Sequence, residues 1–409
     1  MLFKRIVLVL TIIFTFNVSA QETLETPLTQ FSPFLSRAYY NFNFGLVRYP
    51  FSNKNLKLGT TSGGVNKNGF SGRFLFGYKF KEDLAIQFGV MRPATWFEFK
   101  DINGQKFEKS VWINLWSLSI KKNFNINDRL AFYTEAGIGN LNRVGVRIGG
   151  EVIYPDAHYA SLVTGAGFKY TLNKNWDLMI NGMYLPESKK HDQPHILQSS
   201  LGLLYNLRQI PKEEAEGYAN NSKYFFPKRF IQIGYANSGI GFFTNRFLSM
   251  NAKIGNTESL GLPVFWLGDS KAAHTLSLTY QQTAFHTEKL FSLDWGVSVT
   301  GFQTEATKTN VFAFSIFPVL RFYVLRKKAM DLYINYSVIG PTFLTKKNID
   351  NLETGPKLTY QDFMGLGMFV GKKRNLNFEL RIMHYSNGNI FSKNSGVAIP
   401  VVFTVGKTL

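Results

Sequence analysis

Segments of about ten to fourteen residues, in which apolar and polar side chains strictly alternate, recur along this 409-residue chain. In 291–299 the odd positions are apolar and the even positions are small or polar. Leu332, Ile334 and Tyr336 likewise alternate with polar neighbours. A period of two predicts β-strands with one apolar face and one polar face. Strands this long and this frequent favour the wall of a barrel over the shorter strands of a soluble sheet.

The connections between these strands are of two kinds that take turns along the chain. Short polar connections lie at 81–84, 124–129, 172–176, 286–289, 325–329 and 371–375. Longer ones lie between them, at 50–66, 99–109, 143–157, 188–194, 239–273, 342–357 and 387–396, and only 305–308 departs from the pattern by being brief. Alternating tight turns and long loops are typical of outer-membrane β-barrels, which place the loops outside and the turns in the periplasm.

The strand count divides the chain into two halves. About eight strands fit within 37–207 and another eight within 228–406, separated by a hydrophilic stretch at 208–227. Two tandem eight-stranded barrels or one sixteen-stranded barrel satisfy this count. The tandem arrangement is favoured, because so long and polar a linker fits poorly as a periplasmic turn.

The N-terminus and the composition are consistent with an exported membrane protein. Lys4 and Arg5 precede an apolar run at 6–16 and a small-residue cleavage site ending at Ala20, which together predict a signal peptide over 1–20. The chain has no cysteine, which excludes disulfides and thiolate metal sites. It contains 39 Phe and 19 Tyr with a mean hydropathy of −0.09, as expected when lipid-facing and lumen-facing residues alternate. The net charge of +19 favours an anionic lipid or polysaccharide surface over nucleic acid as a partner.

The stretch ELRIMHYSNG (379–388) breaks the pattern in an informative way. Leu380 and Ile382 occupy the apolar, outward face of the seventh strand of the second half, and His384 and Ser386 continue that face. The strand climbs from the short turn at 371–375, so both residues are expected at its outer end, facing the outer leaflet. Residues i and i+2 of a strand share a face, so the imidazole can accept the hydroxyl proton. Polar residues near a membrane interface cost little, and this pair alone can also be read as an ordinary interfacial pair.

The stretch RIMHYSNGNIFSKNSG (381–396) resembles the motif of the lipid A 3-O-deacylase (PagL) family, and YQDFMGLGMFVG (360–371) is similar to the strand that precedes it. The resemblance covers at most 228–409, whereas 21–207 is similar only to a generic small outer-membrane barrel. It implies an eight-stranded barrel that hydrolyses an ester-linked acyl chain of lipid A. It also implies that Ser386 is the nucleophile and that His384 is the general base. The Asn387 amide would stabilise the oxyanion, and Asn394 and Gly396 would shape the site.

One position departs from the family pattern. The family places a Glu after the N-x-G element to orient the histidine, and this chain has Ala398 there. Strand periodicity directs Ala398 inward unless a bulge intervenes. Asp362 offers a substitute, because a turn that pairs Val370 with Leu376 or Phe378 brings Asp362 opposite His384 or Ser386. Asp362 can equally be read as an interfacial acid without a catalytic role.

These features predict an all-β outer-membrane protein with a signal peptide (1–20), a barrel of unknown role (21–207), a linker (208–227) and a lipid A deacylase-like barrel (228–409). Its expected activity is hydrolysis of an acyl ester of lipid A in lipopolysaccharide, with no cofactor, no metal ion and no nucleic-acid partner. The alternative is a non-catalytic barrel with a structural, adhesive or small-solute role that has lost the catalytic acid. The sequence leaves the oligomeric state open.

Overall fold

The structure is a computed structural model that describes 35–65, 68–93, 97–105, 108–211, 213, 224–241, 253–254, 257–258, 268–388, 390–391 and 393–409. The signal peptide expected at 1–20 and part of the linker expected at 208–227 lie outside these residues. Within the described residues, no helix combines the length and the apolar character needed to cross a membrane.

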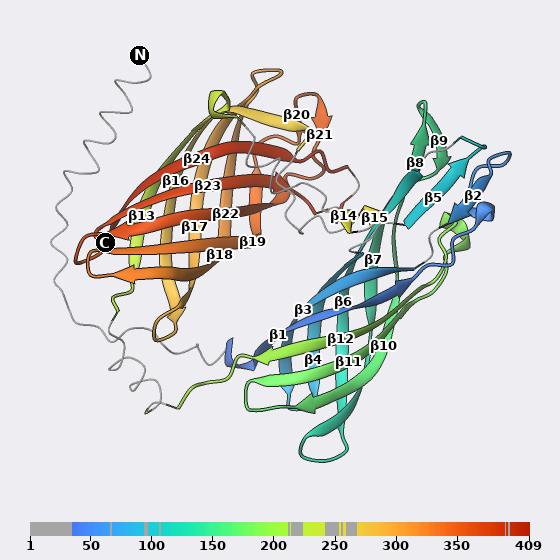
Figure 1. Cartoon of the computed structure of the whole chain (residues 1–409), viewed down its shortest axis with the longest axis horizontal. Coiled ribbons are helices and arrows are strands. Elements are labelled where there is room, and N and C mark those ends of the chain that lie inside the picture. The colour runs from blue at the N-terminus through green and yellow to red at the C-terminus, as the bar shows by residue number, and fades with distance from the viewer. Residues whose placement is uncertain are drawn as a thin grey trace.

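The N-terminal half forms one closed antiparallel barrel of eight strands (Figure 1). These are β1 (Ala38–Arg48), β3 (Asn68–Lys81), β4 (Leu84–Pro93), β6 (Glu108–Asn125), β7 (Leu130–Val144), β10 (Ala157–Thr171), β11 (Trp176–Leu185) and β12 (Ile196–Asn206). Each strand pairs with the next, and β12 returns to pair with β1, with Tyr205 opposite Tyr40.

The C-terminal half forms a second closed barrel of eight strands beside the first (Figure 1). These are β13 (Arg229–Asn237), β16 (Ser270–His286), β17 (Phe291–Thr304), β18 (Asn310–Lys327), β19 (Met330–Leu344), β22 (Leu358–Val370), β23 (Leu376–Ser386) and β24 (Val397–Thr408). The pairing of β24 with β13 closes the ring. The expected pair of eight-stranded barrels is therefore confirmed, and the sixteen-stranded alternative is wrong.

The expected alternation of connections is also present. In each barrel the short turns gather at one end, called here the turn end, and the longer connections at the other, called the loop end. The loop-end connections carry the short strands β2 (Ser62–Val65), β5 (Phe97–Ile102), β8 (Val146–Ile148), β9 (Glu151–Tyr154), β14 (Lys253–Ile254), β15 (Thr257–Glu258), β20 (Asn348–Ile349) and β21 (Leu352–Glu353). Four single turns of 3₁₀ helix complete the described structure: η1 (Leu35–Arg37), η2 (Asn53–Asn55), η3 (Lys189–His191) and η4 (Ser238–Ile240).

The period of two decides which side chains enter the barrels. Along β18, Phe312, Phe314 and Ile316 are exposed, whereas Ala313 and Ser315 between them are buried. In a membrane the exposed face of such a strand contacts lipid, and its apolar side chains suit that environment.

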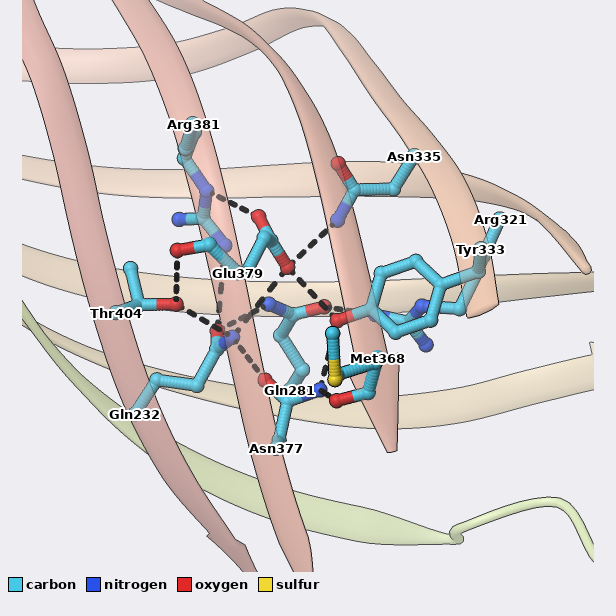
Figure 2. Close-up of polar contacts among 10 residues, drawn as sticks. All are labelled: Gln232, Gln281, Arg321, Tyr333, Asn335, Met368, Asn377, Glu379, Arg381 and Thr404. Carbon is cyan, nitrogen blue, oxygen red and sulfur yellow. Dashed lines mark hydrogen bonds and ion pairs between the residues drawn. The ribbon is translucent and has the colours of Figure 1, made fainter. Parts of the chain in front are cut away.

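A polar network fills the turn-end half of the second barrel (Figure 2). Glu379 accepts hydrogen bonds from Tyr333 at 2.9 Å, Asn335 at 2.9 Å and Arg381 at 2.7 Å. Arg321 pairs with Asp294 in the same lumen. Because these charges are fully buried, their partners offset the cost of removing them from water.

The loop-end half of the same lumen contains a large apolar cluster, which sequence reasoning did not anticipate. Its buried cluster is aromatic and aliphatic: Ala236, Ala272, Phe302, Val311, Ala313, Phe317, Val319, Leu344, Ile349, Phe363, Met383, Tyr385, Val397, Ile399 and Val402. The sequence predicts strands with one apolar face and one polar face, whereas in this half of the barrel both faces carry apolar side chains. Packed side chains at both levels leave the barrel filled rather than open as a pore.

The two barrels contact each other at their turn ends. Ala38 and Leu207 of the first barrel and Phe285 of the second are buried in one apolar cluster, with Tyr205 and Leu293 packed against it. Strands in such barrels tilt by about 35–45° and therefore wind partly around the barrel axis. As a result, the turn end of one strand and the loop end of a distant strand can face the same neighbouring molecule or domain. A contact at the turn ends of β1 and β12 is therefore compatible with a second contact at the loop ends of β6 and β7.

We predict that Glu379→Ala destabilises the second barrel, because it removes the shared acceptor of four buried donors, the three above and Gln232. Breaking a buried charged pair from one side costs about 3–5 kcal/mol. Thermal unfolding of the purified protein measures the effect. The matched control is Glu353→Ala at an exposed glutamate of the loop end, expected to change stability by about 0.5 kcal/mol or less. Equal melting temperatures for the two variants would contradict the prediction.

Candidate functional site

The site lies at the loop end of β23, where the outward face of the strand becomes polar. Glu379 and Arg381 point into the lumen, and Leu380 on the intervening face is exposed. His384 and Ser386 keep the phase of Leu380, so both project from the outer face of the wall, as the sequence predicts.

Asp362 lies directly across from His384 on the neighbouring strand β22. The turn pairs Val370 with Leu376, and this register brings Asp362 opposite His384 and Tyr360 opposite Ser386. The register expected from the sequence is therefore confirmed. Asp362 Oδ2 lies 3.9 Å from His384 Nδ1, which is an ion-pair distance and longer than a hydrogen bond.

A β-bulge in β19 fixes the orientation of the Asp362 carboxylate. The register of β19 against β22 shifts between Ser337 and Gly340. Within this bulge Ile339 has φ of 58°, which is unusual for a β-branched residue, and its N–H donates to Asp362 Oδ1 at 2.9 Å. One carboxylate oxygen thus holds the bulge and leaves the other directed at the imidazole.

Gly396 and Ala398 line the other side of the imidazole. A bulge between β23 and β24 shifts the register between Arg381 and Met383, and Ala398 consequently lies opposite His384. The sequence directs Ala398 inward unless a bulge intervenes, and this bulge is present. Ala398 therefore lies on the same outward face as His384. A Cβ atom on Gly396 would lie only 2.7 Å from His384 Nε2, so the imidazole occupies space that only glycine leaves open.

Gly388 directs a backbone donor at Ser386. The Gly388 N–H lies 3.4 Å from Ser386 Oγ, and the chain turns back there with Gly388 at φ of 60°. Ser386 is half-buried, and no hydrogen bond joins its hydroxyl to His384 in the described structure.

Asn387 and Asn394 brace the loop that follows. The Asn387 side-chain amide donates to the carbonyls of Thr354 at 3.1 Å and Lys393 at 2.7 Å. The Asn387 backbone N–H donates to Asn394 Oδ1 at 2.8 Å. Both N–H groups of the Asn387 side-chain amide are thus engaged by backbone carbonyls, whereas the Gly388 N–H lies within hydrogen-bond distance of the Ser386 hydroxyl. Sequence reasoning assigned the donor role to Asn387 and did not consider Gly388.

His384 is covered and does not lie open to lipid. Its exposed fraction is 3%, and Ile382 on the same outward face is 4% exposed, although Leu380 nearer the turn end is 52% exposed. His384 Nδ1 has no hydrogen-bond partner in the described structure. The outward orientation expected from the sequence is correct, but the expectation that the imidazole faces the membrane directly is not.

Residues of the first barrel contact the loop end of the second barrel beside the candidate site. The Trp116 ring stacks on Tyr360 with centroids 6.5 Å apart and planes at 13°, and a Cβ on Gly388 would lie 3.0 Å from the same ring. Asn140 Nδ2 donates to the carbonyl of Ile390 at 2.7 Å. Neither Trp116 nor Asn140 was singled out from the sequence.

The remaining histidines do not form a metal site. His191 stacks on Tyr159 and shares a hydrogen bond with Ser188, and His195 lies near the Tyr184 ring. Among the described residues, no group of three or more His, Asp or Glu side chains converges as a metal site would require.

Together, these features define an outer-membrane β-barrel protein with two barrels and a Ser-His-Asp arrangement on the outer face of the second. Residues 274–402 match the family model described as Lipid A 3-O-deacylase (PagL). The resemblance of the C-terminal half to this family is confirmed, and the first barrel lies outside the match. No curated protein matches the chain.

Solved structures of small outer-membrane barrels resemble single halves of the chain. The outer membrane enzyme PagL is 14% identical, covers 44% of this chain and 99% of its own, and has a TM-score of 0.31. Neisserial surface protein A is 18% identical, covers 41% of this chain and 96% of its own, and has a TM-score of 0.28. Ail, the attachment invasion locus protein of Yersinia pestis, is 17% identical, covers 41% of this chain and 98% of its own, and has a TM-score of 0.28. At these scores the likenesses carry no argument about function.

We predict that Gly396→Ala displaces the His384 imidazole, because the new methyl group would overlap Nε2. NMR of protein with labelled histidine side chains should show one of the six histidine signals shifted and the others unmoved. The control is Gly182→Ala, whose Cβ would meet nothing nearer than 3.6 Å. A spectrum of Gly396→Ala that matches the unaltered protein would show that the imidazole does not occupy this space.

Proposed function

We propose that the second barrel hydrolyses an ester-linked acyl chain of lipid A in the outer leaflet, with Ser386 as nucleophile and His384 as general base. The observation that carries the proposal is the outward position of these residues at the loop end, within the span that matches the deacylase family. An acyl ester of a membrane lipid is reached from the outer face of a barrel and not from its lumen.

The proposed reaction proceeds in two steps. Ser386 Oγ attacks the ester carbonyl as His384 takes its proton, and the resulting tetrahedral oxyanion is stabilised by the Gly388 N–H or by the Asn387 amide after rearrangement of its loop contacts. The intermediate collapses, the sugar alkoxide leaves with the proton from His384, and the acyl group remains on Ser386. Water, deprotonated by His384, then releases the fatty acid and restores the hydroxyl.

Asp362 is the proposed orienting acid. The Nδ1 nitrogen faces the carboxylate, which leaves Nε2 to exchange protons with Ser386. A small rotation of the imidazole or of the carboxylate would shorten the 3.9 Å separation to a hydrogen bond. Asn394 and Gly396 act indirectly, the first by holding the loop and the second by leaving room for the imidazole.

We further propose the division made from the sequence: an export signal at 1–20, a first barrel within 21–207, a linker at 208–227 and the hydrolytic barrel within 228–409. The substrate would be lipopolysaccharide, and no cofactor is needed for the chemistry described. The second candidate is a non-catalytic barrel, favoured by Ala398 at the position of the family Glu. The filled lumen argues against a small-solute pore in the second barrel.

We predict that Ser386→Ala abolishes release of fatty acid from lipid A by the purified protein, because it removes the nucleophile. Mass spectrometry of the lipid measures the loss of one acyl chain, and kcat should fall by about 10³-fold or more. The control is Ser395→Ala, a serine of the same loop outside the proposed reaction. If Ser386→Ala and the unaltered protein release acyl chains equally, Ser386 is not the nucleophile. If neither releases any, the non-catalytic candidate is favoured.

We predict that Asp362→Asn lowers kcat and that Ala398→Glu in the same chain restores part of it. Asparagine can still accept the Ile339 N–H and preserve the bulge, but it cannot stabilise the imidazolium. Loss of the orienting acid lowers kcat by about 10⁴-fold in serine proteases. A glutamate at 398 would approach His384 from the opposite neighbouring strand. An Asp362→Asn variant with undiminished kcat would exclude Asp362 from the mechanism.

A further inference from the structure

Four outward-facing residues on β6 and β7 of the first barrel form a surface that does not suit lipid. They are Asn114 and Trp116 on β6 and Asn140 and Asn142 on β7, and this set is called here the amide surface. The strand register sets Asn114 opposite Asn142 and Trp116 opposite Asn140, so the four side chains are contiguous.

The rest of this face is typical of a lipid-facing wall. Toward the turn end on the same face, Leu118, Ile120 and Ile138 are 54%, 54% and 67% exposed. An amide facing hydrocarbon without a partner would cost several kcal/mol, on the order of 2–7. Three amides at neighbouring positions therefore indicate that this part of the wall is covered by protein.

The burial of the amide surface agrees with this reasoning. Asn114, Trp116 and Asn142 are 6%, 8% and 9% exposed, although they continue an exposed face. Two of the contacts reach the second barrel: Trp116 stacks on Tyr360, and Asn140 donates to the Ile390 carbonyl.

Both contacts end on residues beside the candidate site: one on the Tyr360 ring and the other on the Ile390 carbonyl. Tyr360 pairs with Ser386 across β22 and β23. The Trp116 ring lies against Gly388, whose N–H points at the Ser386 hydroxyl. Ile390 follows two residues later. The first barrel thus contacts the chain at Gly388 and at Ile390, directly after Ser386.

We propose that the first barrel is a built-in partner of the second, and that Trp116 and Asn140 are positioning residues that hold the turn after Ser386 in its active geometry. This inference rests on the proposed function and extends it, because it gives the first barrel a role in the hydrolysis of an outer-leaflet lipid. It also accounts for a tandem arrangement: the buried turn-end cluster around Phe285 and the amide surface fasten the barrels at both ends.

The docking itself is tested without reference to activity. The chain has no cysteine, so an introduced pair is the only reactive one. Asn140→Cys with Ile390→Cys in the full chain should be joined by a short thiol cross-linker in membranes. The matched control is Leu46→Cys with Ile390→Cys, since Leu46 is 58% exposed on β1. Cross-linking of both pairs to the same extent, or of neither, would overturn the proposal.

The positioning role is tested by kinetics on lipid A. Trp116→Ala and Asn140→Asp should lower kcat by on the order of tenfold to a hundredfold with little change in KM, because they displace the donor and not the substrate. Trp116→Phe should retain most of kcat, since it keeps an aromatic ring on Tyr360. The control is Trp295→Ala, at a tryptophan that is 41% exposed on β17.

Two results separate this inference from the proposed function. If the unaltered protein shows no hydrolysis that depends on Ser386, the proposed function is wrong. The cross-linking experiment would then still decide whether the two barrels dock. An active protein in which Trp116→Ala and Asn140→Asp leave kcat unchanged would keep the function and overturn the positioning role.

Discussion

The phase of side-chain alternation along β23 is the constraint on which the candidate site depends. Glu379 and Arg381 are held in the lumen by buried partners, and a slip of one residue would move both charges into lipid. The same phase directs His384 and Ser386 outward five and seven positions after Glu379. The polar network at the turn end therefore does more than fill the barrel, because it also fixes the outward orientation of His384 and Ser386 at the loop end.

Local patterns in the sequence were sufficient to predict most of the fold. Alternation and connection length gave two sets of eight strands, and the tight turn at 371–375 fixed the register that brings Asp362 opposite His384. The bulges could not be predicted, since an extra residue changes which face the following side chains occupy without a compositional signature. The side of Ala398 and the support of Asp362 by Ile339 both depend on such bulges. The apolar cluster in the loop-end lumen was also missed, because alternation alone does not show whether an apolar side chain faces lipid or the lumen.

The contact between the barrels could not be predicted, because it joins residues about 250 positions apart that share no local pattern. A signal nevertheless exists in the first half. Asn114, Asn140 and Asn142 occupy outward positions, where lipid would demand apolar side chains, and the register sets them side by side. Such a cluster becomes meaningful only when the inward and outward faces are known. Sequence reasoning that assigns faces first, and then searches the lipid-facing side for buried amides, would find surfaces of this kind.

In the proposed mechanism, Asp362 on β22 takes the orienting role that the family Glu would have on β24. A strand in a closed barrel has neighbours on both sides, so a histidine on β23 can be approached by a carboxylate from β22 or from β24. On β24 the place is taken by Ala398, whereas on β22 Asp362 is already oriented by the Ile339 N–H. Backbone strain such as the positive φ of Ile339 costs about 1–3 kcal/mol and persists only where its surroundings hold it. Asp362 accepts the Ile339 N–H with one oxygen, and its other oxygen lies 3.9 Å from His384 Nδ1. In the proposed mechanism this arrangement exists before any substrate binds, which is the preorganisation that an orienting acid requires.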